Sequence, residues 1–371
     1  MGMNMHGRRS LNTGYMSAEG KRIYLLDLLK FLAALGIVLH HYCQLTGETF
    51  THIDFYGGRF SFGTLVELFF IISGFLDAGK RIDNREKYLT HRIRRLYPMV
   101  ILAVLVTAVL EYVYYKVNGA WFYDAKTTLW SLFNSLLLTS SGGAVKVFPI
   151  VNPHWYLCVL MWCYVLRCII DWLSQKWKVA PGYLALGCIF IWEGVAQYGL
   201  DLPFFNVSAS RGITAFFTGV ILWKIWNKFD RKKLVLLSAV ILVFSVVTYF
   251  GEYILFNDNQ QDVLKYIVFP ALVILAISAD RFIPKWAGRP LGFLGKMSYE
   301  MYLWHFTGVL ILDFLLQQGI LVDLGYGSVK MIFLAVLLLV SAALYALVEV
   351  PLGKAVGKIS FVRTQEQNEE E

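Results

Sequence analysis

The sequence is poor in charge. Asp, Glu, Lys and Arg make up only 16% of its 371 residues, 57% of the residues are hydrophobic, and the mean hydropathy is +0.55. A water-soluble chain of this length folds as two or three domains and carries far more charge. Apolar runs long enough to cross about 30 Å of hydrocarbon recur along the whole sequence. The composition therefore excludes a soluble protein and predicts one polytopic, all-α membrane domain.

Cysteines and the usual catalytic motifs are also scarce. The sequence contains no P-loop, HExxH or GxSxG motif and no dinucleotide-binding glycine pattern in a fitting context. The cysteines form neither a CxxC pair nor a metal-ligand spacing, and we expect them to be small packing residues: Cys43, Cys158, Cys163, Cys168 and Cys188. These absences predict no metal site and give no support to metal-dependent, nucleotide-binding or serine-hydrolase chemistry.

The apolar runs predict about ten transmembrane helices. The predicted spans are residues 22–42, 61–78, 95–115, 153–174, 180–198, 211–227, 233–250, 263–279, 298–316 and 328–350. A further run at 128–138 is too short to cross the hydrocarbon comfortably, so it predicts a short re-entrant or interfacial helix.

The distribution of basic residues supports this count. With the amino terminus in the cytoplasm, the cytoplasmic segments hold 25 of the 34 Lys and Arg residues, whereas the outer segments hold only a handful. This asymmetry is expected for loops that stay in the cytoplasm, and it accounts for the net charge of +8 without nucleic acid. We expect a cytoplasmic segment at 1–21, a membrane domain at 22–352 and a cytoplasmic acidic tail at 353–371, with both termini cytoplasmic.

Polar side chains interrupt the first predicted span. Lys30 and His41 are eleven residues apart, which corresponds to about 16 Å of rise and three helical turns plus about 20°. Asp27 shares their face and can pair with Lys30, whereas His40 points about 80° away. Ionisable groups inside a span normally face the bundle interior or a wet cavity. The stripe therefore predicts a site. The simpler alternative is that the Lys30 side chain reaches toward the membrane interface and that His41 marks the position of that interface.

Seven segments, in order, resemble motifs of the acyltransferase 3 family, which comprises bacterial integral-membrane O-acyltransferases that modify sugars, lipids and peptidoglycan. The first is Lys30 followed by His41, similar to a basic-x10-His signature. The others are ELFFIISGFL from Glu67, RIRRLYP from Arg92, HWYLCVLMWCY from His154, RGITAFFTGVIL from Arg211, GKMSYEMYLWHF from Gly295 and VEVP from Val348. The sequence departs from the family pattern at two of these positions. Lys30 stands where many family members have Arg, and Glu67 stands where Asp is common in the family.

The resemblance implies transfer of an acyl group from cytoplasmic acyl-CoA, with acetyl-CoA the expected donor, to a hydroxyl group. We predict His41 as the general base, since imidazole titrates near neutral pH, with Lys30 and Asp27 as a polar pair on the same face. In the basic loop 79–95, Arg92 and Arg95 are predicted to bind the CoA phosphates. The alternative is that this loop is only an anchor on the cytoplasmic side.

The acceptor is predicted to be a cell-envelope carbohydrate or lipid-linked sugar, contacted by Glu67, Ser73, Trp155, Tyr156, Arg211, Tyr302 and His305. An aromatic belt at the interface is the alternative reading of the Trp and Tyr residues. The expected location is the bacterial cytoplasmic membrane. We expect membrane lipids as partners and no nucleic acid, and the sequence leaves open whether the protein forms a homo-oligomer. The rival functions are a transporter or flippase of a sugar or lipid-linked substrate, and a catalytically silent membrane protein.

Overall fold

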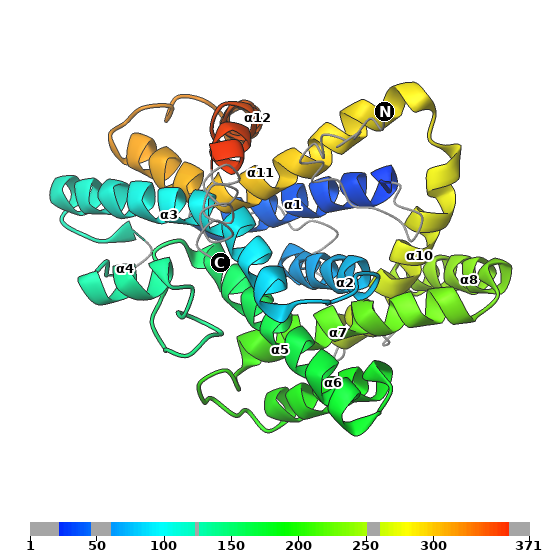
Figure 1. Cartoon of the computed structure of the whole chain (residues 1–371). Helices are drawn as coiled ribbons and strands as arrows, with labels where there is room; N and C mark the ends of the chain where they lie inside the picture. The colour runs from blue at the N-terminus through cyan, green and yellow to red at the C-terminus, as the bar shows by residue number, and fades with distance from the viewer. Residues whose placement is uncertain (1–21, 46–60, 123–125, 251–259, 356–371) are drawn as a thin grey trace, which may run out of the picture.

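The computed structural model describes residues 22–45, 61–122, 126–250 and 260–355, which form a helical bundle (Figure 1). Among these residues only isolated β-bridges occur, such as the one between Ser140 and Val145, so the all-α prediction is confirmed. The predicted segment 1–21 and residues 356–371 of the predicted tail lie outside the described residues. The helices are α1 (Tyr24–Leu45), α2 (Leu65–Ala78), α3 (Arg85–Asn118), α4 (Leu129–Leu136), α5 (Trp155–Trp177), α6 (Pro181–Gln197), α7 (Val207–Lys228), α8 (Arg231–Phe250), α9 (Gln260–Val263), α10 (Phe269–Ala279), α11 (Lys285–Gln317) and α12 (Tyr326–Leu344).

Each predicted span coincides with a helix or with a run of short helices. Among the described residues, six helical stretches are long and apolar enough to cross a membrane: Tyr24–Gln44, Arg85–Asn118, Asn152–Trp177, Arg231–Tyr249, Gln260–Phe282 and Gly327–Ala355. The apolar windows of the fourth and sixth stretches are only 11% and 17% buried inside the bundle. Such exposed apolar surface is stable against lipid. The protein is therefore a multi-pass membrane protein, and ten is an approximate count of its spans, since α2 and α6 have only 14 and 17 residues.

Two helices begin well before their predicted spans. α3 starts at Arg85, because the side chain of Asn84 accepts a hydrogen bond from the Lys87 backbone N–H at 2.8 Å and caps the helix. α11 starts at Lys285 and continues through the basic segment that precedes its apolar run. The prediction of a loop over residues 85–95 is therefore wrong. Basic residues near the membrane surface continue the helix because solvent and phosphate groups accommodate their charge.

The short run near 128–138 forms α4, a helix of eight residues. The Thr128 side chain and Ser131 form a reciprocal capping box that fixes its start. Eight residues rise only about 12 Å, so α4 is too short to cross a bilayer, as predicted. Leu129, Trp130 and Phe133 expose their large apolar side chains, which suits a helix lying at the membrane interface.

The centre of the bundle is built by two close helix pairs. α2 packs most extensively against α7, and α1 packs against α11. A Cβ on Gly74 would lie 1.9 Å from the backbone oxygen of Phe216, and a Cβ on Gly219 would lie 2.0 Å from that of Ile71. Glycine at both positions thus lets the α2 and α7 backbones touch, which is how membrane helices gain packing contact. This packing places the polar residues of α1 and α2 in the interior.

Candidate active site

Asp27 and Lys30 lie side by side on the buried face of α1, as their spacing predicts. The Lys30 Nζ donates to Asp27 Oδ1 at 2.8 Å, and Arg22 Nε donates to Asp27 Oδ2 at 2.5 Å. Asp27 and Lys30 are only 0% and 4% exposed. α11 approaches them at Gly295, where a Cβ would lie 2.3 Å from the Asp27 Cβ. One buried carboxylate therefore holds two cations at the contact between α1 and α11.

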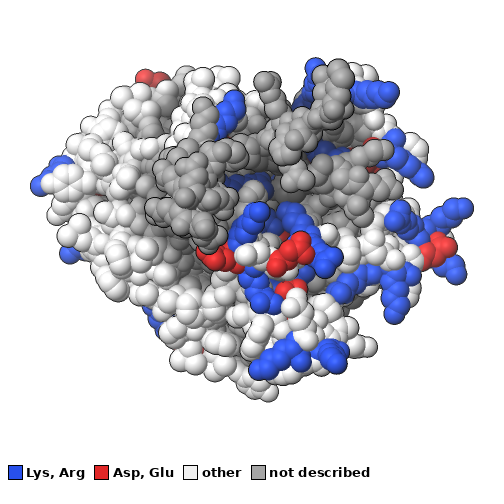
Figure 2. Space-filling view, in the orientation of Figure 1, with Lys and Arg blue, Asp and Glu red and all other residues white. Residues whose placement is uncertain are grey.

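Lys30 also lines a cavity of about 90 Å³ between α1, α2, α3, α5, α11 and the helical segment Tyr345–Glu349 that follows α12. Six of the predicted site residues, from these five helices, line this cavity: Lys30, Ser73, Arg92, Arg95, Tyr156 and Tyr302. On the surface, Lys and Arg side chains gather around a hollow on the face where α3 begins (Figure 2). The fold thus brings together polar residues that the sequence analysis drew from distant motifs.

The cavity carries an excess of positive charge. Four basic residues and one acidic residue, Glu349, line it. Arg92 is buried, pairs with Asp77 and lies over the ring of Tyr164, 4.4 Å from the ring centroid. Arg95 is half-buried and shares the lining with Lys296. Asp77 offsets the charge of Arg92, and Asp27 offsets that of Lys30. Arg95 and Lys296 are the other two cations of the lining, and Glu349 faces them, so the lining carries a net positive charge.

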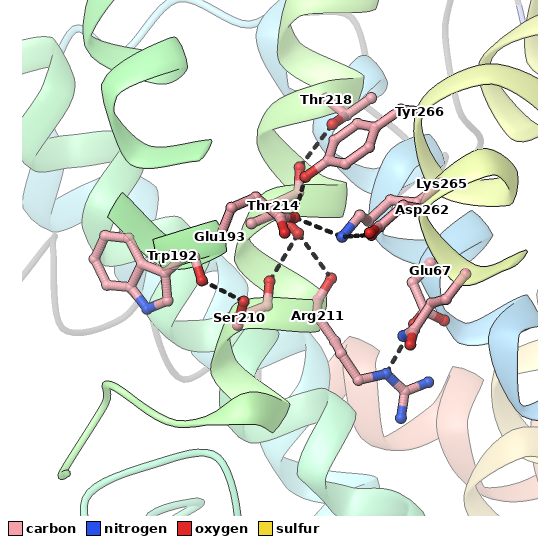
Figure 3. Close-up of polar contacts among 11 residues, drawn as sticks. Glu67, Trp192, Glu193, Ser210, Arg211, Thr214, Thr218, Asp262, Lys265 and Tyr266 are labelled. Carbon is pink, nitrogen blue, oxygen red and sulfur yellow. Dashed lines mark hydrogen bonds and ion pairs between the residues drawn. The ribbon is translucent and has the colours of Figure 1, made fainter. Parts of the chain in front are cut away.

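A second polar cluster lies at the other end of α2, around Glu67 (Figure 3). Arg211 Nε donates to Glu67 Oε1 at 2.8 Å, and Gln261 Nε2 donates to the same oxygen at 2.6 Å. The Arg211 guanidinium lies over the Trp155 ring, 5.0 Å from its centroid. Glu67 Oε2 is buried and has no hydrogen-bond partner among the described residues. Three residues predicted to bind the acceptor, Glu67, Trp155 and Arg211, therefore form one cluster.

His41 faces the interior and contacts His305 of α11. The His305 Nδ1 lies 2.7 Å from the backbone oxygen of Tyr302, which can only accept, so this nitrogen carries the proton. In the neutral ring the His305 Nε2 is then an acceptor, and it lies 3.0 Å from the His41 Nδ1. His41 Nδ1 must therefore donate, either to His305 or to the Ile37 oxygen at 3.2 Å. This network assigns the lone pair of His41 to Nε2.

Tyr302 lies between the cavity and the histidine pair. It lines the cavity, and its ring centroid is 5.7 Å from that of His305 and 5.3 Å from that of Tyr156. Its hydroxyl donates to the Pro153 backbone oxygen at 2.8 Å, which fixes the ring. The lining of the cavity reaches Tyr302 but includes neither His41 nor His305. The Tyr302 ring therefore separates the cavity from the histidine pair in this conformation.

The sequence analysis missed two charged residues at the cavity. Asp77 holds Arg92 and also accepts a hydrogen bond from the Tyr88 hydroxyl at 2.9 Å, and Lys296 lines the cavity. Asp77 is an acid within the apolar run that forms α2, which is a signal that sequence reasoning can use. Lys296 lies between two motif residues and has no comparable signal.

Comparisons with known proteins identify the family of this chain. Residues 23–348 match the acyltransferase 3 family, described as an acyltransferase domain. The proposed membrane-bound transacylase BcsY of Komagataeibacter xylinus is 23% identical over 350 residues, which cover 87% of this chain and 81% of that protein. The O-acetyltransferase OatA of Staphylococcus aureus (strain COL) is 24% identical over 328 residues, covering 79% of this chain and 52% of OatA, so the match spans about half of OatA. No solved structure matches the chain. The chain belongs to the acyltransferase 3 family, and it is a membrane acyltransferase.

Proposed function

We propose that the protein transfers an acetyl group from acetyl-CoA to a hydroxyl group of a cell-envelope glycan or lipid-linked sugar, with His41 as the general base. The observation that carries the proposal is the contact between His41 and His305 next to a positively charged cavity. Relatives named as a transacylase and an O-acetyltransferase support acyl transfer to oxygen.

The cavity would hold the donor. CoA carries several phosphate charges, and Arg95, Lys296 and Arg92 line the cavity or hold its wall. Arginine forks and ammonium groups bind phosphate oxygens through charge-assisted hydrogen bonds. The lining also includes aromatic rings, among them Tyr156 and Tyr302. This combination of cations and aromatic rings suits a molecule with a charged nucleotide and a long neutral arm that ends in a thioester.

The proton transfer follows from the histidine pair. His41 Nε2 would take the proton of the acceptor hydroxyl as its oxygen attacks the thioester carbonyl carbon. The C–S bond then breaks, and the proton on His41 passes to the departing CoA thiolate, so that atoms and charges balance. His305 Nε2 and the Ile37 oxygen are the acceptors within reach of His41 Nδ1, and they would keep the ring oriented. Lys30, held by Asp27, would position the thioester end of the donor.

The acceptor would enter from the opposite side. Glu67, Arg211 and Trp155 lie together in a cluster at the far end of α2 from Asp77 and Arg92. Carboxylate and guanidinium groups form hydrogen bonds with sugar hydroxyl groups, and an indole ring packs against the C–H face of a sugar ring. The proposed orientation has both termini and the basic ends of the helices in the cytoplasm of the bacterial cell, so that donor and acceptor meet across the membrane. The Tyr302 ring must then move for the thioester to reach His41.

Sealed proteoliposomes test this assignment. Purified protein is reconstituted in one orientation, labelled acetyl-CoA is placed on the side of the α3 amino terminus, and an acceptor glycan is placed only on the opposite side. The proposal predicts labelled glycan with the native protein and none with His41→Ala. Transfer only when donor and acceptor share one side would contradict the transmembrane arrangement, and no transfer in any arrangement would contradict the proposed donor or acceptor.

A further inference from the structure

A second pocket, of about 30 Å³, lies between α5, α6 and α7, outside the proposed donor and acceptor sites. Its lining combines two basic side chains, Arg167 and Lys224, with apolar residues that include Pro181, Ala185 and Phe217. The pocket lies at the end of the bundle that carries the carboxyl end of α2, because Ala78 also lines it. This is the end with the basic helix starts, where lipid phosphates of the cytoplasmic leaflet are expected.

Arg167 has an incomplete set of partners. Its Nε lies 3.7 Å from Asp77 Oδ2, beyond hydrogen-bond distance, and it is buried without a hydrogen-bond partner among the described residues. The Asp77 carboxylate already binds Arg92 and the Tyr88 hydroxyl through its other oxygen. One carboxylate thus faces two guanidinium groups, and the Arg167 side chain, which is 11% exposed, retains uncompensated charge.

Lys224 adds a second positive charge to the same pocket. Its stem lies against the start of α6, where a Cβ on Gly182 would be 3.2 Å from the Lys224 Cδ. Lys224 and Arg167 are close enough to repel each other. α6 begins at Pro181, and Ala180 gives its first turn no side-chain cap. Two cations and an uncapped helix amino terminus together create a positive potential that an anion would stabilise.

α6 also exposes an apolar stripe. Tyr183, Leu186 and Phe190 are spaced as one helix face and are 71%, 38% and 73% exposed, whereas Pro181 and Ala185, which line the pocket, lie on the opposite face of the helix. In a membrane this stripe contacts lipid chains. α6 is therefore a lipid-facing helix, and the headgroup of a neighbouring lipid lies within reach of the pocket at its amino end.

We propose that Arg167 and Lys224 bind the phosphate of an anionic membrane lipid. The site goes beyond the proposed acyl transfer and does not depend on it. The other source of the same chemistry is a phosphate of the donor nucleotide, because Arg92 of the donor cavity and Arg167 share Asp77. The position of the pocket favours the lipid, since the pocket lies at the amino end of a lipid-facing helix and shares no lining residue with the donor cavity.

Native mass spectrometry of the delipidated full chain tests the site directly. Phosphatidylglycerol and phosphatidylcholine are added separately, and bound lipid is counted for the native protein and for Arg167→Gln/Lys224→Gln. The native protein is expected to bind phosphatidylglycerol about tenfold more tightly than phosphatidylcholine, and the double variant is expected to lose that preference. A matched control, Arg81→Gln/Lys232→Gln, removes two exposed basic residues outside the pocket and should keep the preference.

Further variants and one kinetic measurement separate the outcomes. Arg167→Lys retains the positive charge next to Asp77. Lys224→Gln leaves the contacts of Arg167 intact, so reduced lipid binding by this variant does not reflect misfolding. Unchanged lipid preference in the folded double variant would overturn the site. If the double variant instead raised the KM for acetyl-CoA but not for its 3′-dephospho form, the phosphate would belong to the donor and the lipid assignment would be wrong. Because the lipid measurement needs no acyl transfer, its result is independent of the proposed function.

Discussion

The His41 Nδ1 lies 3.0 Å from the His305 Nε2, although 264 residues separate the two histidines in the sequence. This contact defines which nitrogen of His41 carries the lone pair. A histidine with a defined tautomer and a fixed ring is suited to take a proton in one direction. The pair therefore links the polar stripe of α1 to the aromatic segment of α11.

Replacing His305 should lower the turnover rate and leave the donor KM nearly unchanged. His305→Leu removes the nearer of the two acceptors for His41 Nδ1 and leaves only the Ile37 oxygen at 3.2 Å, so we expect kcat to fall about 10- to 100-fold, less than the ~10²–10⁴-fold loss for a missing base. His305→Gln can still accept through Oε1 and should recover part of the rate. Steady-state kinetics with acetyl-CoA measure both effects. Equal rates for Leu and Gln variants would show that the contact does not position His41.

Replacing Asp27 should destabilise the protein more than replacing Lys30. Asp27→Asn leaves Lys30 buried without a carboxylate, and breaking such a pair costs about 3–5 kcal/mol. Lys30→Met keeps the pair between Asp27 and Arg22, so we expect a smaller loss, about 1.5–3 kcal/mol. Thermal unfolding in detergent, followed by tryptophan fluorescence, ranks the two variants. The opposite order would contradict the assignment of Asp27 as the shared counter-ion.

Replacing Arg95 should weaken donor binding with little loss of stability. Arg95→Gln removes a half-buried cation of the donor cavity, and we expect the KM for acetyl-CoA to rise about tenfold, in line with the loss of a charge-assisted hydrogen bond. Arg92→Gln leaves Asp77 buried without its closest cation, so it should also lower the melting temperature. Kinetics and thermal unfolding of both variants, at low and high salt, distinguish these roles. An unchanged KM for Arg95→Gln would remove Arg95 from the donor site.

A methyl group at the contact between α2 and α7 should prevent correct packing. In Gly74→Ala the new Cβ would lie 1.9 Å from the Phe216 backbone oxygen, and backbone atoms in a helix pair cannot give way cheaply. We expect little monodisperse protein after purification. Gly187→Ala is the matched control, since nothing lies within 4 Å of its Cβ and alanine favours a helix over glycine. Size-exclusion profiles compare the two, and a well-folded Gly74→Ala protein would contradict the close contact.

Much of the fold could be predicted because a bilayer imposes a simple rule on sequence. Apolar runs of sufficient length predicted helices at all ten positions, and the basic residues separated the short α4 from the spans. The ends of helices were harder to predict. α3 and α11 extend beyond their apolar runs to Arg85 and Lys285, because capping and solvent-exposed basic residues continue a helix without changing hydropathy.

The candidate site could be predicted only in part, for a different reason. Helical spacing placed Asp27 beside Lys30, because both lie on one helix. The partner of Arg92, Asp77, and the contact between His41 and His305 depend on how separate helices pack, and periodicity within one helix carries no such information. The roles predicted for the individual site residues stay predictions until the variants are measured.

The most direct test of the central claim compares two adjacent histidines. The account assigns the base to His41, whereas His40 points elsewhere, toward Gly63, where a Cβ would lie 3.1 Å from the His40 Nε2. Transfer from labelled acetyl-CoA by purified, folded His41→Ala and His40→Ala should differ sharply, with a loss of about 10²–10⁴-fold for His41→Ala and a rate within about fivefold of native for His40→Ala. A His41→Ala protein that keeps its rate, or equal losses for both variants, would contradict the account.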